Sequence, residues 1–306
     1  MDDRLLVCNR DDDCVSVIDP AAGETVRTIG TDFGPRTIET SPDGAKSYLT
    51  CSQGNALNVV DNETFSVTGR IDHDLFDGPR GLVVRDRANE LWVVSEHNNR
   101  VFVFDIETDA LLDVIPTHQS RSNSISLDSD ESTAYVTNSN GNTLTIIDCD
   151  QRRITVDVPV GDGPEGVGVN PDTDNVYVTV QRESRLTVHD PARHDTIYET
   201  GLGESPMGIV FAPDGAIALV ANRLSNDVSV IETRFHRGGE GRPWEVERIP
   251  VGIWPGGIVF DSDGSRAYVT NNKTNDVSVI DPGTREEVDR IDVGTFPDGI
   301  TYLSGR

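Results

Sequence analysis

One phrase recurs along the whole chain about every 42 residues. Its cleanest copy runs from Gly256 to Pro297 and contains a short apolar strand, the turn Ser-Asp-Gly, the words Tyr-Val-Thr-Asn and Asp-Val-Ser-Val-Ile-Asp, and a last strand. The turns that precede the copies end at Pro35, Pro79, Ser120, Pro164, Pro206, Pro255 and Pro297. Such a period indicates a repeat architecture, in which each unit buries its apolar face against the next.

Each repeat contains four short runs of alternating or β-branched residues bounded by Gly, Asp, Asn and Pro, which predicts a four-stranded antiparallel meander. Six repeats are complete. The N-terminal segment supplies only the second, third and fourth strands of a seventh, and the C-terminal segment supplies only the first. Pairing these two segments closes a ring and removes the open edge. We therefore predict a single all-β domain, a seven-bladed β-propeller closed by the C-terminal strand pairing with the N-terminal three. The predicted blades are 298–306 with 1–35, 36–79, 80–120, 121–164, 165–206, 207–255 and 256–297.

The phrase Tyr-Val-Thr-Asn occurs intact at Tyr135 to Asn138 and at Tyr268 to Asn271, with degenerate copies in the other repeats. On these residues the whole chain resembles the YVTN-repeat β-propeller family, which is similar to the propeller lactonases and lactonising enzymes. That resemblance implies the fold. It implies two kinds of function, because the family includes interaction proteins as well, and the lactonases use Arg, His and Glu near the channel mouth.

The charge of the chain restricts its partners. Asp and Glu number 52 against 26 Lys and Arg, for a net charge of −26, and only Lys46 and Lys273 are lysine. This balance disfavours nucleic acid and anionic membranes as partners and is typical of halophilic proteins. No apolar run approaches the roughly 20 residues of a membrane span, and no secretory signal is recognisable. We expect a soluble cytoplasmic monomer, or a secreted or periplasmic one if a signal peptide was removed.

The residue after each inter-blade turn is predicted to begin the innermost strand and to line the mouth of the axial channel. These residues are Arg36, Arg80, Arg121, Glu165, Met207, Gly256 and Asp298. Three successive arginines predict an anion site, because guanidinium groups bind carboxylates bidentately. The alternative is that they pair with Asp77, Glu39 or Asp298 and fill the channel.

Three of the six histidines fall in the same sector: His73 and His118 in inter-blade turns, and His97 in a loop of the third blade. Imidazole transfers protons near neutral pH, so His97 with Glu96 or Glu165 is the predicted proton-transfer pair. As an alternative, His73, His97 and His118 would bind a metal ion.

Two further features of the turns and loops are expected to matter. Trp254 and Phe296 precede two inter-blade prolines and either wall the pocket or pack between blades. Cys51 replaces the Asn of the phrase and is either a small buried thiol or a nucleophile. The four cysteines have no metal-binding spacing, which predicts reduced thiols. The insertion from Phe235 to Trp244 predicts a mobile loop on the face opposite the arginines.

The sequence favours an enzyme without metal or cofactor that acts on a small anionic, carboxylate-bearing substrate by acid–base chemistry. Lactone opening, lactonisation and a lyase step all fit. The predicted catalytic residues are His97 and Glu165. The predicted substrate-binding residues are Arg36, Arg80, Arg121, His118, His73, Trp254 and Asp298. The alternatives are a non-catalytic interaction or ligand-binding scaffold and a metal-dependent enzyme that uses the three histidines.

Overall fold

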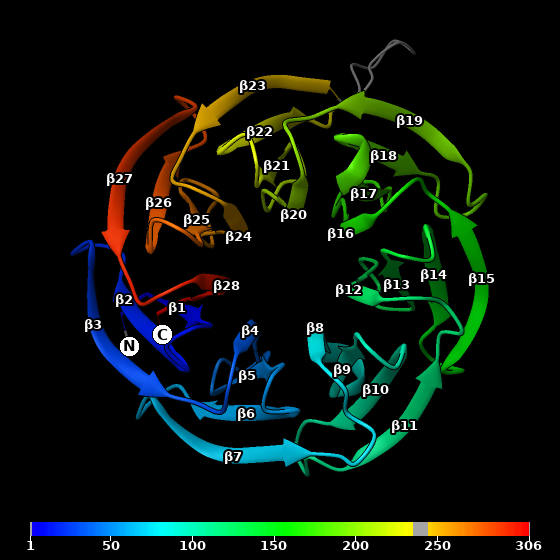
Figure 1. The fold of residues 1–306 in the computed structure, drawn as a ribbon, viewed down its shortest axis with the longest axis horizontal. Coiled ribbons are helices and arrows are strands. Elements are labelled where there is room, and N and C mark those ends of the chain that lie inside the picture. Colours follow the sequence, from blue (N-terminus) through cyan, green and yellow to red (C-terminus); the bar gives the residue numbers. More distant parts are fainter. Residues whose placement is uncertain (1, 235–243, 306) are drawn as a thin grey trace.

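The computed structural model describes residues 2–234 and 244–305, which form seven four-stranded antiparallel sheets arranged in a ring (Figure 1). The first four sheets contain β28 (Pro297–Leu303), β1 (Arg4–Asn9), β2 (Cys14–Asp19) and β3 (Glu24–Gly30); β4 (Pro35–Thr40), β5 (Lys46–Cys51), β6 (Ala56–Asp61) and β7 (Ser66–Asp72); β8 (Pro79–Arg85), β9 (Glu90–Ser95), β10 (Arg100–Asp105) and β11 (Leu111–Pro116); and β12 (Ser122–Leu127), β13 (Thr133–Asn138), β14 (Thr143–Asp148) and β15 (Arg153–Pro159). The other three contain β16 (Pro164–Val169), β17 (Val176–Val180), β18 (Arg185–His189) and β19 (Thr196–Gly201); β20 (Pro206–Phe211), β21 (Ile217–Asn222), β22 (Asp227–Glu232) and β23 (Trp244–Pro250); and β24 (Pro255–Phe260), β25 (Ala267–Asn271), β26 (Asp276–Asp281) and β27 (Glu286–Asp292). Two short 3-10 helices, η1 (Asp86–Ala88) and η2 (Gln181–Glu183), connect strands.

The ring closes as the sequence predicts, which confirms the seven-bladed fold. β28 pairs antiparallel with β1, Leu303 lying opposite Arg4 and Pro297 opposite Asn9, so that this sheet has the order β28-β1-β2-β3. In Figure 1 the red strand β28 lies beside the blue strand β1. The predicted loop from Phe235 to Trp244 lies outside the described residues except for its last member. The described residues contain no helix with the length and apolar character of a membrane span.

The core lies between neighbouring sheets. Because side chains alternate across a strand, each blade presents one apolar set to the blade before it and another to the blade after it. Four large aromatic side chains of the second strands are almost completely inaccessible to solvent: Tyr48, Trp92, Tyr135 and Tyr177. The hydroxyl of Tyr48 donates a hydrogen bond across the blade boundary to the Ile106 carbonyl (3.0 Å), which ties two sheets together.

The innermost strands approach each other closely around the axis, and glycine makes this possible. A Cβ on Gly166 would lie 2.3 Å from the Met207 carbonyl oxygen, and one on Gly299 would lie 2.2 Å from the Arg36 carbonyl oxygen. Only a residue without a side chain fits at these two positions. The strands β4, β8, β12, β16, β20, β24 and β28 therefore enclose a narrow channel of about 590 Å³.

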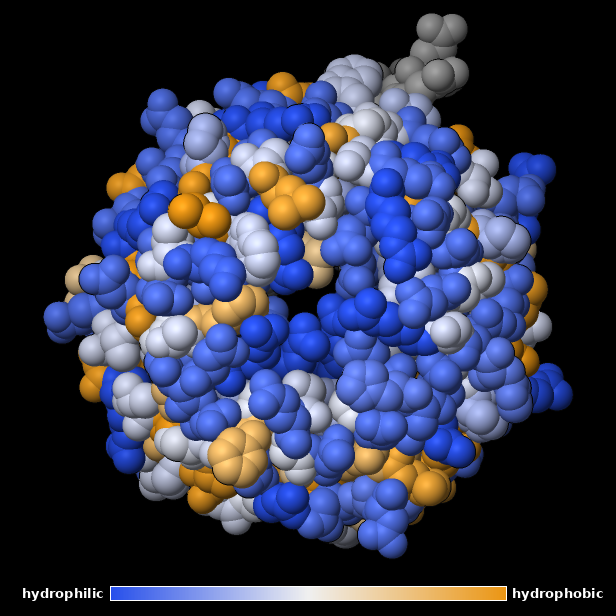
Figure 2. Space-filling view, in the orientation of Figure 1, coloured by the Kyte–Doolittle hydropathy of each residue, from blue (hydrophilic) through white to orange (hydrophobic). Residues whose placement is uncertain are grey.

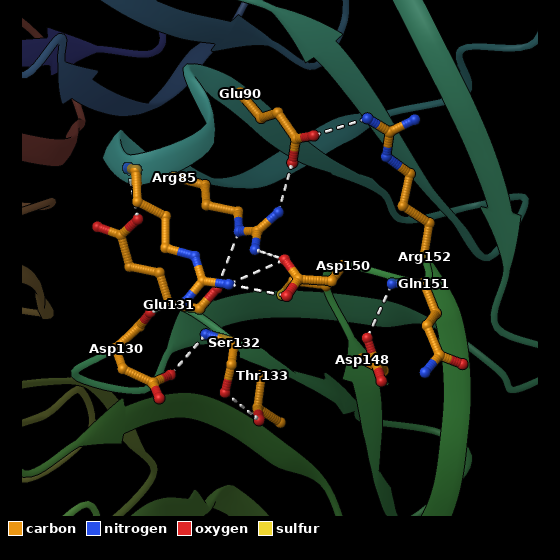
Figure 3. A network of polar contacts seen from close by, with 12 residues as sticks. Arg85, Glu90, Asp130, Glu131, Ser132, Thr133, Asp148, Asp150, Gln151 and Arg152 are labelled. Atoms are coloured by element: carbon orange, nitrogen blue, oxygen red, sulfur yellow. Dashed lines mark hydrogen bonds and ion pairs between the residues drawn. The ribbon is translucent and has the colours of Figure 1, made fainter.

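A network of charged side chains joins two blades on the face away from the inter-blade turns (Figure 3). Arg85, at the end of β8, forms ion pairs with Glu90 (3.3 Å) and with Asp150 of the next blade, and its Nε donates to the Glu131 carbonyl (2.8 Å). Arg152 of that next blade forms an ion pair with Glu90 (2.7 Å). This Arg85–Glu90 clamp connects the β8–β11 sheet to the β12–β15 sheet.

Candidate functional site

Two positions per blade form the rim of the channel mouth. The first is the second residue of the innermost strand: Arg36, Arg80, Asn123, Glu165, Met207, Gly256 and Asp298. The second is the residue that follows the second strand: Arg10, Ser52, Glu96, Ser139, Gln181, Arg223 and Asn272. The backbone N–H groups of this second set donate to carbonyls of the inter-blade turns, for example Glu96 to Gly78 (2.9 Å) and Asn272 to Trp254 (2.9 Å). Both sets therefore meet on one face of the disc.

Strongly hydrophilic side chains border the channel mouth over β4, β8 and β12 (Figure 2). The prediction that Arg121 begins an innermost strand is wrong. Ser122 takes the place that proline has in the other blades, opposite Asn138, so that Asn123 is the rim residue. Arg121 lies in the preceding turn with φ 59°. The turn lacks its Gly-Pro, and the Ser122 hydroxyl instead donates to Asn138 Oδ1 (2.7 Å).

Arg121 nevertheless reaches the same cluster as Arg36 and Arg80, because all three surround Glu96. Glu96 Oε1 accepts hydrogen bonds from Arg121 Nε (2.7 Å) and Arg80 Nη1 (3.1 Å), and Arg36 Nη1 lies 3.8 Å from Oε2. The Glu96 side chain is only 5% exposed. Burial alone would raise the pKa of Glu96, but Arg80, Arg121 and Arg36 outweigh it and the pKa is lowered. Glu96 is therefore a carboxylate at neutral pH.

Arg80 connects Glu96 to a second buried acid, Glu165. Arg80 Nη2 lies 3.1 Å from Glu165 Oε2, which also accepts a hydrogen bond from Asn123 Nδ2. Burial disfavours the charged Arg80 side chain, but Glu165 and Glu96 overcome this and raise its pKa. Arg36 pairs with Asp298 (3.2 Å), and burial together with Arg80 lowers its pKa. The three predicted arginines thus form one ion cluster with Glu96, Glu165 and Asp298.

This pairing matches part of the predicted alternative in which internal acids neutralise the arginines. Asp298 is a partner, as that alternative expects. Asp77 is not, because it pairs with His97. Glu39 also lines the channel, but its carboxyl group has no hydrogen bond or ion pair among the described residues. Burial raises the pKa of Glu39 to about 7.

The structure does not bring the three histidines into the channel. The His97 side chain is 62% exposed and its Nδ1 lies 3.1 Å from Asp77 Oδ1, outside the channel lining. His118 is exposed in a turn with φ 56°, and His73 packs beside Phe102, with ring centroids 5.5 Å apart. Within residues 2–234 and 244–305, no group of three or more His, Cys, Asp or Glu side chains could hold a metal ion. The alternative three-histidine metal centre is therefore not formed.

The aromatic candidates lie in inter-blade turns, and the thiol candidate Cys51 lies in the core. Trp254 and Phe296 each precede an innermost strand and do not line the channel. Their ring centroids are 6.5 Å apart, and the Trp254 ring lies beside the channel-lining Arg223, whose guanidinium is 5.7 Å away. Cys51 is completely buried, and burial raises the pKa of its thiol to about 12, so that it is a poor nucleophile at neutral pH. All four cysteines are free thiols.

Sequence reasoning missed Asn123 and the second rim position, including Arg223. The signal was present: in each repeat, the residue directly after the Tyr-Val-Thr-Asn phrase or its degenerate copy occupies that rim position. Comparing the seven copies at this position gives Arg10, Glu96 and Arg223 as the charged members. Arg223 lines the channel on the side opposite the Glu96 cluster, in the sheet that begins with β20.

The comparisons with known proteins agree with this architecture. The family described as the SMP-30/gluconolactonase/LRE-like region matches residues 83–220, which is less than half of the chain. No curated protein matches the sequence significantly.

Solved structures resemble the whole ring. A putative 6-phosphogluconolactonase of Bacteroides fragilis is 17% identical, with 98% of each chain covered and a TM-score of 0.81. A functionally unknown protein of Desulfotomaculum acetoxidans is 12% identical, with 99% of each chain covered and a TM-score of 0.84. Hydrazine synthase of Kuenenia stuttgartiensis is 17% identical over 91% of this chain and 92% of the other, with a TM-score of 0.81. At these identities the likeness establishes the fold alone.

Proposed function

We propose that the protein binds a small carboxylate-bearing metabolite at the channel mouth and hydrolyses a lactone by acid–base chemistry. The observation that carries this proposal is the cluster of Arg36, Arg80 and Arg121 around the buried acids Glu96 and Glu165, with Asp298 beside Arg36, at one end of an open channel. The match of residues 83–220 to a gluconolactonase-like region favours lactone hydrolysis over lactonisation or a lyase step.

In the proposed reaction Glu165 is the general base. It accepts a proton from a water molecule, the oxygen of that water adds to the lactone carbonyl, and Arg80 stabilises the negative charge that develops on the carbonyl oxygen. The ring C–O bond then breaks, the leaving oxygen takes the proton from Glu165, and the product is an open hydroxy acid. Asn123 is a positioning residue, because it holds Glu165 Oε2, and Arg80 both holds Glu165 and stabilises the developing oxyanion. We assign no step to His97, which lies outside the channel.

The test is hydrolysis of a panel of γ- and δ-lactones that carry a carboxylate, and the rate is measured from the release of acid. Glu165→Gln is expected to lower kcat/KM by about 10² to 10⁴, the usual contribution of a general base. The control is Glu204→Gln, because Glu204 is exposed in a turn on the same face and does not line the channel. Hydrolysis no faster than the uncatalysed rate with the wild-type protein, or full activity of Glu165→Gln, would overturn the proposal.

The second candidate function is binding without catalysis. Two observations favour it: each predicted arginine is already paired with an internal carboxylate, and the predicted catalytic histidine is exposed, pairs with Asp77 and does not line the channel. Titration calorimetry with lactones and with the corresponding hydroxy acids distinguishes the two. Binding of these compounds with no turnover by the wild-type protein would support the binding function.

A further inference from the structure

Arg223 differs from the other arginines at the channel mouth in its partners. Its Nη2 donates to Asn272 Oδ1 (3.1 Å), while its Nε is buried without a hydrogen-bond partner. Arg223 lines the channel, so the unpaired N–H belongs to a side chain in contact with the space that a ligand would enter. The Nε itself has almost no accessible surface, so what Arg223 offers a ligand in the channel is the rest of its charged guanidinium group.

The charges around the mouth are unevenly matched. Arg36, Arg80 and Arg121 are balanced by Glu96, Glu165 and Asp298, three against three. Neither Arg223 nor Lys273 has an ion-pair partner within the part of the chain that the structure describes. Burial lowers the pKa of Arg223, with Asp298 and Glu165 acting against this effect and Arg80 reinforcing it. Arginine still keeps its proton, so an uncompensated positive charge lies on this side of the channel.

Aromatic rings hold these cations at the mouth. Lys273 Nζ lies 4.9 Å from the centroid of the Trp254 ring and 5.3 Å from that of Phe296, and the Arg223 guanidinium lies 5.7 Å from the Trp254 ring. The Phe296 ring also contacts a second cation: the Arg10 guanidinium lies 3.7 Å from its centroid. Cations within about 6 Å of an aromatic ring are attracted to its face. One of the two lysines of the chain therefore sits between two rings at this edge.

The residue before each innermost strand has a left-handed backbone in all seven blades. It is glycine in three blades (Gly34, Gly78 and Gly163), whereas the other four have Arg121 (φ 59°), Ser205 (57°), Trp254 (61°) and Phe296 (56°). At this position the Trp254 ring contacts Lys273 and Arg223, and the Phe296 ring contacts Lys273.

We propose that Arg223 and Lys273 form the subsite for the carboxylate of the ligand, and that Trp254 and Phe296 contact a compact ring-shaped or apolar carbon skeleton attached to it. This inference rests on the proposed function and narrows its substrate. Because Glu165 belongs to the opposite cluster, the carboxylate and the reacting ester group are at different ends of the ligand. The class is thus a lactone with a distal carboxylate.

Calorimetry with two ring carboxylates and their uncharged counterparts tests the subsite. The probes are benzoate and cyclohexanecarboxylate, with benzamide and cyclohexanecarboxamide as uncharged analogues. Wild-type protein is expected to bind the carboxylates at least 10-fold more tightly than the amides. Arg223→Gln and Lys273→Gln are each expected to weaken carboxylate binding by about 10-fold to 100-fold, as loss of a charge-assisted hydrogen bond would. Arg223→Lys should restore part of the affinity.

The control is Arg182→Gln, because Arg182 is a half-exposed arginine of the same face that pairs with Asp162 (2.8 Å) and does not line the channel. The affinity of the Arg182→Gln protein for the carboxylates should equal that of the wild type. Equal binding of amides and carboxylates, or unchanged binding by a folded Arg223→Gln protein, overturns the subsite. Circular dichroism establishes that each variant is folded.

The two proposals fail in different ways. If carboxylates bind through Arg223 but no lactone is hydrolysed, the subsite stands and the lactonase function is wrong. If lactones are hydrolysed and Arg223→Gln leaves KM unchanged for lactones with a distal carboxylate, the function stands and the subsite is wrong. Glu165→Gln should still bind the carboxylates, because it leaves Arg223 and Lys273 in place.

Discussion

Glu39 has an environment unlike that of the other acids of the channel. It lies three residues after Arg36 on β4, about 10 Å further along the axis at the rise of an extended strand. The equivalent residues of the other blades are uncharged: Val83, Ser126, Gly168, Val210, Val259 and Thr301. No described cation pairs with Glu39. Burial therefore acts alone on its carboxyl and raises the pKa to about 7.

This environment makes the stability of the protein depend on pH. Because the folded pKa lies above the unfolded value, Glu39 lowers the stability of the folded protein as pH rises from about 4.5 through about 7. Glu39→Gln removes this dependence. We expect it to raise the free energy of unfolding by about 1 to 3 kcal/mol at pH 8 and to change it little at pH 4.5, as measured by urea denaturation.

A matched control removes the same charge elsewhere. Glu63 is exposed in the turn between β6 and β7, and Glu63→Gln should change stability by less than about 0.5 kcal/mol at both pH values. An effect of Glu39→Gln that is equal at pH 4.5 and pH 8 would contradict the assignment, because it would show that the carboxyl does not titrate between them.

At the scale of elements, the Arg85–Glu90 clamp joins the β8–β11 sheet to the β12–β15 sheet on the face away from the channel mouth (Figure 3). Glu90 is 5% exposed and accepts hydrogen bonds from Arg85, Arg152 and the Trp92 indole. Burial would raise the pKa of Glu90, but these three partners outweigh it and the pKa is lowered. The clamp therefore stabilises the fold above the pKa of an unfolded glutamate and loses this effect as pH falls.

We expect Glu90→Gln to lower the free energy of unfolding at pH 7 by about 2 to 4 kcal/mol, because it leaves buried guanidinium charge without its carboxylate. Below pH 3 the difference from the wild type should shrink as the native Glu90 protonates. Asp150→Asn is the comparison, since Asp150 binds the same Arg85 but is 62% exposed, and its loss should destabilise the protein much less than Glu90→Gln. Equal losses from the two variants in guanidinium chloride titrations would show that burial does not decide the strength of the clamp.

The strands were predictable and part of their register was not. The recurring phrase, the Pro-Asp-Gly-like turns and the split seventh repeat predict the blades and the seam, because each depends on local sequence alone. Arg121 was misplaced because its turn has no Gly-Pro from which to count, and only the pairing of Ser122 with Asn138 sets the strand. Arg223 was missed because the first rim position alone was compared between repeats. Which arginine has a carboxylate partner depends on contacts between blades, and no single repeat encodes those.

At the scale of the whole molecule, the net charge of −26 has a measurable effect. Acids outnumber bases two to one, so the average long-range interaction across the surface is repulsive. Raising KCl from 0.1 M to 1 M shortens the screening length from about 10 Å to about 3 Å. We expect the Tm to rise by several degrees over this range. Sucrose at matched osmolality is the control for solvent exclusion, and a Tm that falls with KCl would show that the attractive ion pairs outweigh the repulsion.

The seam between β28 and β1 also means that the two paired strands are synthesised at very different times. Pro297 follows Arg4 by 293 positions, so a ribosome adding about 5 to 20 residues per second needs about 15 to 60 s between the two strands. Throughout that interval the inner edge of β1, which β28 covers in the native ring, has no native neighbour, and an unpaired edge is a template for strands of other chains. The first sheet to be translated is thus the last to be completed, and the nascent ring depends on its final strand arriving before a foreign one.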